Sequence, residues 1–442
     1  MPVRKSIAAV LLGALILAGC AGTGPAKSQP PPAGLTFGPE LRPGRPEASP
    51  AWPFMRIAPD GRLYLVWTEK DQTHGAAPST TDNTAHNHNH ASDSNLRAAY
   101  ISASMDDGQT WSAPLRINDQ PENVQGDENE AKIAFGKDGQ LYTAWAIPDP
   151  TGNKMKATIR FSMLDQSGQF KPAQSLNEVP NAARFVALQT APDGTVLAAW
   201  IDRRVDSPAP RQIYMTRLSP TGEVLTQNYQ VADDSCECCR IMLAFADNGK
   251  TVYLSYRQKP ANNIRNIVVR KSTDGGATFG APVVVSDDGW EIAGCPHSGA
   301  VMATDARGHL HVIWFTMGRK PAEAGIYYSV STDGGATFSQ RQLVEAANGT
   351  GVLRPYLAVS EQGDVYMAWT NYVKGTEQTQ IFFRHMPAGA TAMSPVQQVS
   401  QAEGNGVWPN LAVSKEKLYL SWTVQKEDAT WVGLRVAPIT KP

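Results

Sequence analysis

Apolar and polar residues alternate along the chain in short runs that end in a turn and then in an aromatic residue. In Arg56–Trp67 and Leu357–Trp369, an apolar strand, a turn containing Gly and a second strand follow one another. The alternation predicts half-buried β-strands, and the Gly predicts a tight turn. The aromatics that end the second strand recur mostly at intervals of about 55 residues, at Trp67, Trp145, Trp200, Tyr256, Trp314, Trp369 and Trp422. We therefore expect seven copies of a unit long enough for four short strands.

A second repeat follows this aromatic frame in phase. The eight residues Ser331–Phe338 recur unchanged at Ser272–Phe279, and Ser104–Trp111 keeps the Ser, Asp, Gly and final aromatic positions. In such a stretch the Asp can accept bonds from nearby backbone N–H groups, the Gly supplies a positive φ, and the aromatic anchors the outgoing strand. The repeat therefore predicts a hairpin turn wherever it occurs.

These repeats resemble the Asp-box, or BNR repeat, of sialidase-like β-propellers. The resemblance implies an all-β fold, a single β-propeller of four-stranded blades over Leu35–Pro442. The unit count favours seven blades, with six, the number in true sialidases, as the alternative. The last unit has no room for a fourth strand before the C-terminus, whereas Thr36–Pro39 resembles Thr278–Pro282. An N-terminal strand is therefore expected to close the ring.

The N-terminus carries a targeting signal. Arg4 and Lys5 precede the apolar run Ile7–Leu17, which is too short to span a bilayer. Leu17–Cys20 resembles the end of a bacterial lipoprotein signal, which implies a signal peptide over 1–19, lipidation of Cys20 and attachment to the outer membrane. An ordinary secretory signal is the alternative. Residues 20–34 are rich in Pro and Gly and predict a flexible tether.

The net charge and one insertion limit the classes of binding partner that we expect. The 442 residues carry a formal net charge of −1 and no basic stretch, so we expect no nucleic-acid partner. The first unit is lengthened by a polar loop at about 72–96 that contains His86, His88 and His90. A short tract of this kind can collect metal ions such as copper or zinc, but a solvated loop with incidental His is the alternative.

Sulfur and imidazole groups begin two consecutive units. Cys236 and Cys295 occupy one aligned position ahead of the first strand, and Cys238 and His297 occupy the position two residues on, with Cys239 beside them. Positions two apart share one side of a strand. Two interpretations remain open. Four Cys in an oxidising compartment could pair as disulfides, with Cys236 and Cys295 joining neighbouring blades, or thiolates and one imidazole could bind Zn²⁺ or Cu⁺.

Charged and aromatic residues occupy the corresponding positions in other units. They are Asp127, Glu128, Glu130, Arg184, Arg240, Arg354, Trp52 and Trp408. Carboxylates, Arg and Trp around one channel mouth would suit an anionic or sugar-like ligand, although an ion-paired lining of a structural channel has the same composition.

Three functions follow as hypotheses. The first is an envelope lipoprotein that binds a small molecule, a glycan or a metal ion at the channel mouth. The second is a sialidase-type glycoside hydrolase, which the resemblance implies would use an arginine triad, an Asp and a Tyr–Glu pair. The sialidase motif that contains the first of these arginines is matched only by Phe54–Pro59, where an extra Met precedes Arg56. We therefore assign no catalytic set. The third is a scaffold that binds envelope proteins.

Overall fold

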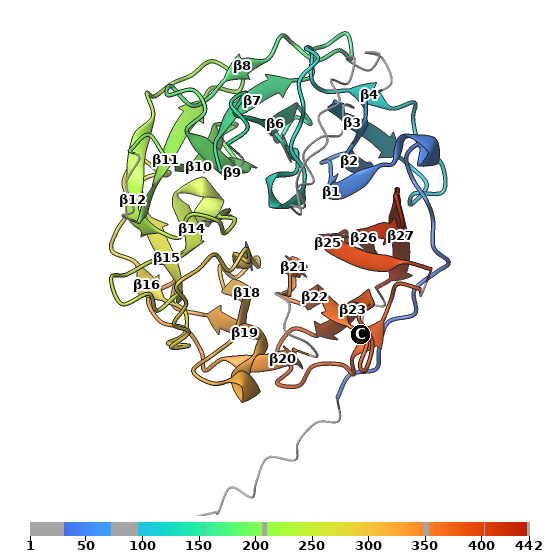
Figure 1. Cartoon of the computed structure of the whole chain (residues 1–442), viewed down its shortest axis with the longest axis vertical. Coiled ribbons are helices and arrows are strands. Elements are labelled where there is room, and N and C mark those ends of the chain that lie inside the picture. Colours follow the sequence, from blue (N-terminus) through green and yellow to red (C-terminus); the bar gives the residue numbers. More distant parts are fainter. Residues whose placement is uncertain are drawn as a thin grey trace, which may run out of the picture.

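The computed structural model describes residues 31–71, 96–153, 155–205, 210–347, 353–401 and 403–439. The predicted signal peptide, the predicted lipidation site Cys20 and the tract of His86, His88 and His90 lie outside these ranges. The described chain is all-β, with four short 3₁₀ turns, and its strands form small sheets arranged in a ring around a central axis (Figure 1). The predicted β-propeller arrangement is therefore confirmed.

The strands follow one another as antiparallel neighbours. The first sheet holds β1 (Ala51–Ile57), β2 (Leu63–Lys70), β3 (Arg97–Ser104) and β4 (Leu115–Arg116). The next holds β5 (Lys132–Phe135), β6 (Leu141–Pro148), β7 (Ala157–Met163), β8 (Gln174–Ser175), β9 (Ala183–Thr190), β10 (Val196–Asp202), β11 (Arg211–Leu218) and β12 (Tyr229–Ser235). The third holds β13 (Met242–Ala246), β14 (Thr251–Arg257), β15 (Ile267–Ser272) and β16 (Val283–Val284).

The second half of the ring repeats the pattern. One sheet holds β17 (Val301–Thr304), β18 (Leu310–Thr316), β19 (Gly325–Ser331) and β20 (Gln342–Ala346). The next holds β21 (Pro355–Val359), β22 (Val365–Tyr372), β23 (Thr379–Met386) and β24 (Gln397–Gln398), and the last holds β25 (Asn405–Val413), β26 (Lys417–Lys426) and β27 (Ala429–Pro438). The 3₁₀ turns are η1 (Pro46–Ala48), η2 (Asp127–Asn129), η3 (Asp247–Gly249) and η4 (Pro321–Glu323).

Two details differ from the sequence prediction. Seven separate four-stranded sheets are not formed within the described ranges, because β7 and β9 pair at Ala157 and Ala183, whose small side chains allow close approach, and so merge eight strands into one sheet. No strand forms at Thr36–Pro39. Leu41 instead makes an isolated bridge with Leu434 of β27, and the Gly38 N–H donates to the Val436 carbonyl. Pro39 has no N–H to extend this ladder.

The aromatic frame forms the core between sheets. Each frame residue lies on the second strand of its run, and the frame tryptophans are at most 1% exposed. Complete burial of an indole contributes several kcal/mol, on the order of 3–5, which truncation to Ala would remove. The repeat that the sequence pattern predicted is thus a repeated packing position.

The first strand of each run lines the central channel. A cavity of about 420 Å³ is bounded by residues of β1, β9, β13, β17, β21 and β25, among them Ile57, Leu243, Met302 and Leu357. The segments that lead into these strands therefore meet at one mouth of the channel, where the candidate site residues were expected.

The Asp-box turns lie at the other end. In Ser331–Phe338 the Asp333 carboxylate accepts bonds from the N–H and hydroxyl of Thr337 at 2.9 and 2.6 Å, and the Gly335 N–H donates to Ser331 Oγ at 2.8 Å. The bond from the Thr337 hydroxyl lowers the pKa of Asp333 to about 2. The turn joins β19 to β20, and because neighbouring strands are antiparallel, this end is opposite the segment that enters β17.

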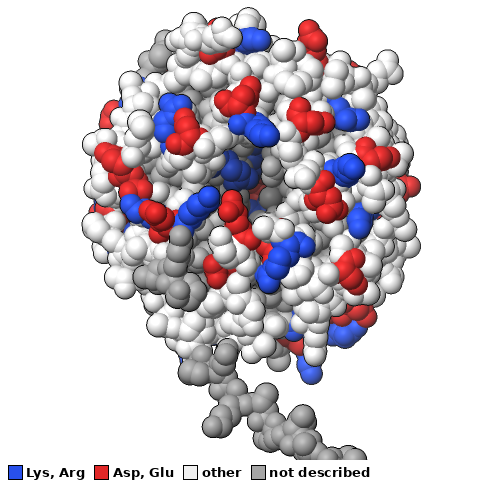
Figure 2. All heavy atoms as spheres, turned by 180° about the vertical axis from the view of Figure 1, so that it is seen from behind, with Lys and Arg blue, Asp and Glu red and all other residues white. Residues whose placement is uncertain are grey.

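Charges of both signs are interspersed on the face opposite the view of Figure 1, around a central hollow (Figure 2). This face presents no single-sign field of the kind that steers polyanions. Among the described residues, no helix has the length and apolar character needed to cross a membrane.

Candidate functional site

Seven of the eight predicted ligand-binding residues, Glu130 among them, line one narrow pocket at the channel mouth. Trp52 comes from β1, Asp127 and Glu128 from η2, Arg240 and Arg354 from the segments entering β13 and β21, and Trp408 from β25. Only Arg184 lies outside the lining. Residues from five parts of the sequence thus converge because each precedes or begins an inner strand.

Unusual backbone conformations turn side chains into this mouth. Trp52, Asp127, His297 and Trp408 have positive φ values of 56°, 61°, 48° and 51°. The register of β1 against β2 shifts between Ala51 and Phe54, and that of β25 against β26 shifts between Val407 and Asn410. Positive φ in a bulky residue costs about 1–3 kcal/mol and is characteristic of functional sites.

Arg354 is held between an indole and a carboxylate. Its guanidinium carbon lies 5.3 Å from the ring centroid of Trp408, and its Nε lies 3.8 Å from Asp127 Oδ1. The indole N–H of Trp408 donates to the same carboxylate oxygen at 2.5 Å. Asp127 therefore orients both Arg354 and Trp408.

Arg240 is held against the next unit. Its Nη2 donates to the Pro355 carbonyl at 2.5 Å, and its guanidinium lies 5.8 Å from the Tyr356 ring. Gly299 permits this arrangement, since a Cβ at that position would lie 2.1 Å from the Arg240 carbonyl oxygen.

Glu128 is the most perturbed carboxyl of the mouth. It is 4% exposed, and neither carboxylate oxygen has a hydrogen-bond partner among the described residues. Burial raises the pKa of Glu128 to about 7, against the opposing effect of Arg240 and Arg354. A carboxyl that changes charge near neutral pH therefore lies between two arginines.

Two predicted ligand-binding residues have other contacts. Glu130 pairs with Lys132, so its charge is already compensated. The Arg184 Nη1 donates to Met155 Sδ at 2.8 Å, and its guanidinium covers the Phe185 ring. Burial lowers the pKa of Arg184. The register shift in β9 near Phe185, which also has positive φ, turns Arg184 away from the pocket lining.

A wider cavity of about 670 Å³ adjoins this narrow pocket. It shares Asp127, Arg354 and Trp408 and adds Cys295 and His297 on one side. Polar groups complete its wall, namely Thr370, Asn371, Tyr372, Glu377, Thr379, Asn405 and Gln425. The sequence alignment did not single out these groups, because all except Glu377 and Asn405 lie on second and third strands rather than at the aligned starts.

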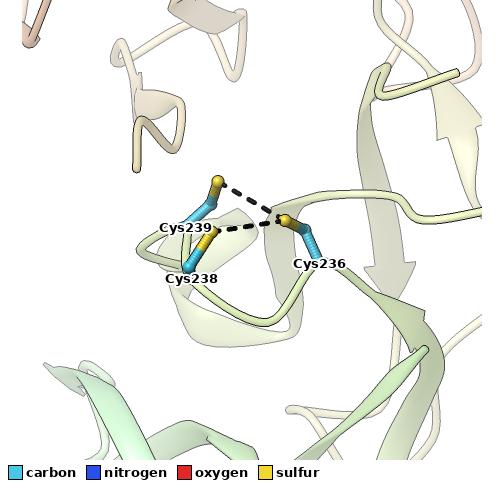
Figure 3. Close-up of side chains that lie close together, drawn as sticks. All are labelled: Cys236, Cys238 and Cys239. Carbon is cyan, nitrogen blue, oxygen red and sulfur yellow. Dashed lines mark hydrogen bonds between the residues drawn. The ribbon is translucent and has the colours of Figure 1, made fainter. Parts of the chain in front are cut away.

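The four described cysteines form one cluster beside this cavity. Cys236 Sγ lies 3.7 Å from both Cys238 Sγ and Cys239 Sγ (Figure 3). Hydrogen bonds from the Cys238 and Cys239 thiols lower the pKa of Cys236 well below its usual range, whereas the bond to Cys236 raises the pKa of Cys238 and burial raises that of Cys239. Cys238, Cys295 and His297 form a second group, so Cys238 belongs to both.

All four described cysteines are free. The predicted disulfide between Cys236 and Cys295 is therefore not formed in this structure. The alignment did anticipate the neighbourhood, because the matched positions of Cys238 and His297 lie in one group whose ligand atoms are within 4.8 Å of one another. It missed Met155, which packs against the cluster from a loop without an aligned motif.

A third group of titratable residues lies elsewhere. Asp305, His309 and His311 cluster at the turn between β17 and β18, and His311 Nδ1 lies 2.7 Å from the Tyr328 hydroxyl. Burial lowers the pKa of His311 to about 4. A buried His that is hydrogen-bonded in this way fits a structural role.

No protein-family model and no curated protein sequence matches this chain. Among solved structures, a protein of unknown function from Dyadobacter fermentans is 15% identical over 92% of this chain and all of that chain, with a TM-score of 0.51. An ulvan lyase is 9% identical over 88% of this chain and 94% of that chain, with a TM-score of 0.57. Both matches show the β-propeller fold alone.

A sialidase from Trypanosoma rangeli is also similar, at 11% identity over 88% of this chain and 55% of that chain, with a TM-score of 0.47. The chain is a β-propeller. Its activity must be argued from the site.

Proposed function

We propose that this protein is a binding propeller that holds an anionic saccharide at one mouth of its channel. The observation that carries this proposal is the position of Arg354, which lies between the Trp408 ring and Asp127 at the wall of the 670 Å³ cavity. A planar guanidinium binds carboxylate or sulfate oxygens through paired N–H groups, and an indole packs against the apolar face of a sugar ring.

The charge balance of the mouth favours an anion. Arg240 and Arg354 face Asp127 and Glu128, while the charge of Glu130 is compensated by its ion pair with Lys132. Because the pKa of Glu128 is raised to about 7, its carboxyl is neutral in about half of the molecules at neutral pH. In that form the arginines exceed the carboxylates by one charge, which an acidic ligand would neutralise.

The remaining wall supplies hydrogen-bonding groups for hydroxyls. Asn371, Thr379 and Gln425 line the same cavity, and Tyr372 adds an aromatic face. A concave site with a few polar groups and an aromatic surface is typical of small-ligand recognition.

Calorimetric titration with polysaccharides tests the proposal. The panel should include sialylated, uronate-containing and neutral glycans, and the unit -[GlcA(1-4)Rha3S]-, which the ulvan lyase was solved with. We expect binding of acidic members only, weakened about 10- to 100-fold in Arg354→Ala, since a bond to a charged partner contributes about 1.5–3 kcal/mol. Arg62→Ala, exposed at the β1–β2 turn, is the matched control. Equal affinity of Arg354→Ala and wild type would refute the proposal.

A glycoside hydrolase is the second candidate, because a carboxyl with a pKa of about 7 suits a general acid at neutral pH. Turnover of a fluorogenic sialoside or another glycoside, lost in both Glu128→Gln and Arg354→Ala, would support this activity. Binding without turnover across the panel would favour the binding propeller.

We also propose that Cys20 carries the lipid anchor and places the propeller at the outer membrane. Support comes from the sequence Leu17-Ala18-Gly19-Cys20 after an apolar run. Labelled fatty acid should be incorporated into wild type and not into Cys20→Ala, which should lose its attachment to membranes.

The ring itself is proposed to have seven blades. The runs β5–β8 and β9–β12 each have the strand order of a single blade, and the Leu41–Leu434 bridge begins an outer edge for the three-stranded sheet. Accelerated hydrogen exchange at Leu434 after removal of residues 31–41 would support this closure.

A further inference from the structure

The cysteine cluster is a second feature of the mouth that saccharide binding does not require. Cys236, Cys238 and Cys239 lie in the segment between β12 and β13, and all three are at most 1% exposed. Cys295 and His297 come from the segment that enters β17 and line the wide cavity. The two groups meet at Cys238.

The sulfur separations suit a shared metal ion. A disulfide requires about 2.05 Å between sulfur atoms. Four thiolates around one ion at a metal–sulfur distance of about 2.3 Å lie about 3.8 Å apart, and three in a plane lie slightly farther apart. Cys236 Sγ lies 3.7 Å from each of the other two sulfurs (Figure 3). The cluster is therefore spaced as a set of ligands.

Two buried arginines lie beside the cysteine cluster. Arg265 is 2% exposed, and its Nη1 donates to Cys236 Sγ at 3.2 Å. Arg257 is fully buried, and its N–H groups donate to the carbonyls of Ser298, Arg265 and Phe315. Within the described ranges, no carboxylate forms an ion pair with either guanidinium. Because isolated buried charges are costly, thiolates formed when the cluster binds a metal ion would serve as counter-ions to these arginines.

The number of donors favours a three-coordinate ion. Each group offers three ligand atoms within 4.8 Å of one another, and no four of these atoms in the described chain meet that limit. Zn²⁺ in a structural site takes four ligands in a tetrahedron, whereas soft thiolates also select Cu⁺. Three thiolates, two guanidiniums and one Cu⁺ have zero net charge.

We propose that Cys236, Cys238 and Cys239 bind one Cu⁺ ion. Cys295 and His297, with Cys238, form an outer group at the cavity wall through which the ion reaches this buried position. The inner group is enclosed, whereas His297 is exposed and shares the cavity with Arg354. This arrangement gives the metal a path from solvent to the buried thiolates.

The experiment uses the full chain, reduced and stripped of metal under anaerobic conditions. Cu⁺ is titrated in competition with a chromogenic Cu⁺ chelator, and metal content is measured after desalting. We expect one tightly held Cu⁺ per chain and a copper X-ray absorption spectrum with a sulfur-only first shell. Cys238→Ser should weaken binding by about 100-fold or more, because a direct ligand is worth at least as much as its supporting shell. His309→Ala is the control for adventitious binding at the distant His group.

Folding of the variants is checked by circular dichroism. If Cys238→Ser does not fold, the midpoint of thermal unfolding of wild type with and without Cu⁺ tests the proposal instead. Cu⁺ that binds the native state must raise this midpoint. Three outcomes would each overturn the proposal. The first is a protein with two disulfides that does not bind Cu⁺ after reduction. The others are a preference for Zn²⁺ over Cu⁺ and unchanged Cu⁺ binding in folded Cys238→Ser. Arg354→Ala should retain Cu⁺, so failure of saccharide binding and failure of metal binding are distinguishable.

Discussion

Glu128 Oε1 lies 4.0 Å from Arg354 Nε, yet neither carboxylate oxygen of Glu128 accepts a hydrogen bond from a described residue. The two groups therefore interact through charge alone, and the cost of burying the carboxylate exceeds that attraction. The resulting pKa of about 7 makes Glu128 a proton-binding group at the mouth of the channel.

Replacement of Glu128 by Gln should change how stability depends on pH. The folded-state pKa of about 7 exceeds the ordinary value of 4.5, so the folded protein binds more protons than the unfolded chain between these values. Wild-type stability should therefore fall as pH rises from 4.5 to 7. Glu128→Gln should lack this loss and be more stable at pH 8 by at most about 3 kcal/mol, at 1.36 kcal/mol per pKa unit.

Urea unfolding of both proteins from pH 4.5 to 8 measures this difference. Glu361→Gln, at an exposed turn, should show the wild-type profile. Parallel curves for wild type and Glu128→Gln over the whole range would show that Glu128 does not have a raised pKa.

The same proton should govern ligand affinity. Neutralisation of Glu128 leaves Arg240 and Arg354 less compensated, so an acidic saccharide should bind more tightly at pH 6 than at pH 8. His297 gains its proton at a lower pH than an ordinary imidazole, because burial lowers its pKa. Glu128→Gln should bind with the low-pH affinity throughout, which calorimetry at several pH values would measure. Pronounced pH dependence that persists in Glu128→Gln would assign the effect to another group.

Two equivalent tryptophans should contribute differently to the stability of the protein. Trp314 and Trp369 occupy matching positions on β18 and β22 and are both fully buried. The Trp314 indole donates to Asp288 Oδ2 at 2.6 Å, whereas the Trp369 indole N–H has no hydrogen-bond partner in the described part of the chain. Trp314→Phe should therefore destabilise the protein by about 2 kcal/mol more than Trp369→Phe, because it removes a bond to a buried carboxylate. Denaturant unfolding of the pair measures the difference, and equal losses would contradict it.

The sequence predicted the parts of the fold that repeat. Trp145 and its later equivalents recur about every 55 residues at one buried position, so periodicity alone reveals them. The Asp-box turns were predictable for the same reason, since Asp333 and Gly335 satisfy local backbone needs. The pairing of Ala157 with Ala183 depends on how two sheets approach, which no local pattern encodes.

The site was predictable where its residues precede inner strands. Alignment of those starts placed Glu128, Arg240 and Arg354 together, as the pocket lining does. The partners of these residues were not predictable, because they come from other strands and loops. Met155 and Arg265 approach the cysteines in this way, and Lys132 forms an ion pair with Glu130.

Gly126 should be required for the shape of the mouth. A Cβ at this position would lie 2.0 Å from Cε3 of Trp52, although φ of Gly126 is an ordinary −118°. Gly126→Ala must therefore displace the Trp52 indole, which lies 6.0 Å from the Trp408 ring, and overpacking of this kind costs about 1–3 kcal/mol. We expect altered tryptophan fluorescence and about tenfold weaker saccharide binding, because the indole would move into the space beside Arg354 and Trp408. Gly280→Ala is the control, since its nearest contact is the Lys271 carbonyl at an ordinary 3.5 Å. Wild-type fluorescence and affinity in Gly126→Ala would mean that Trp52 does not shape the binding site.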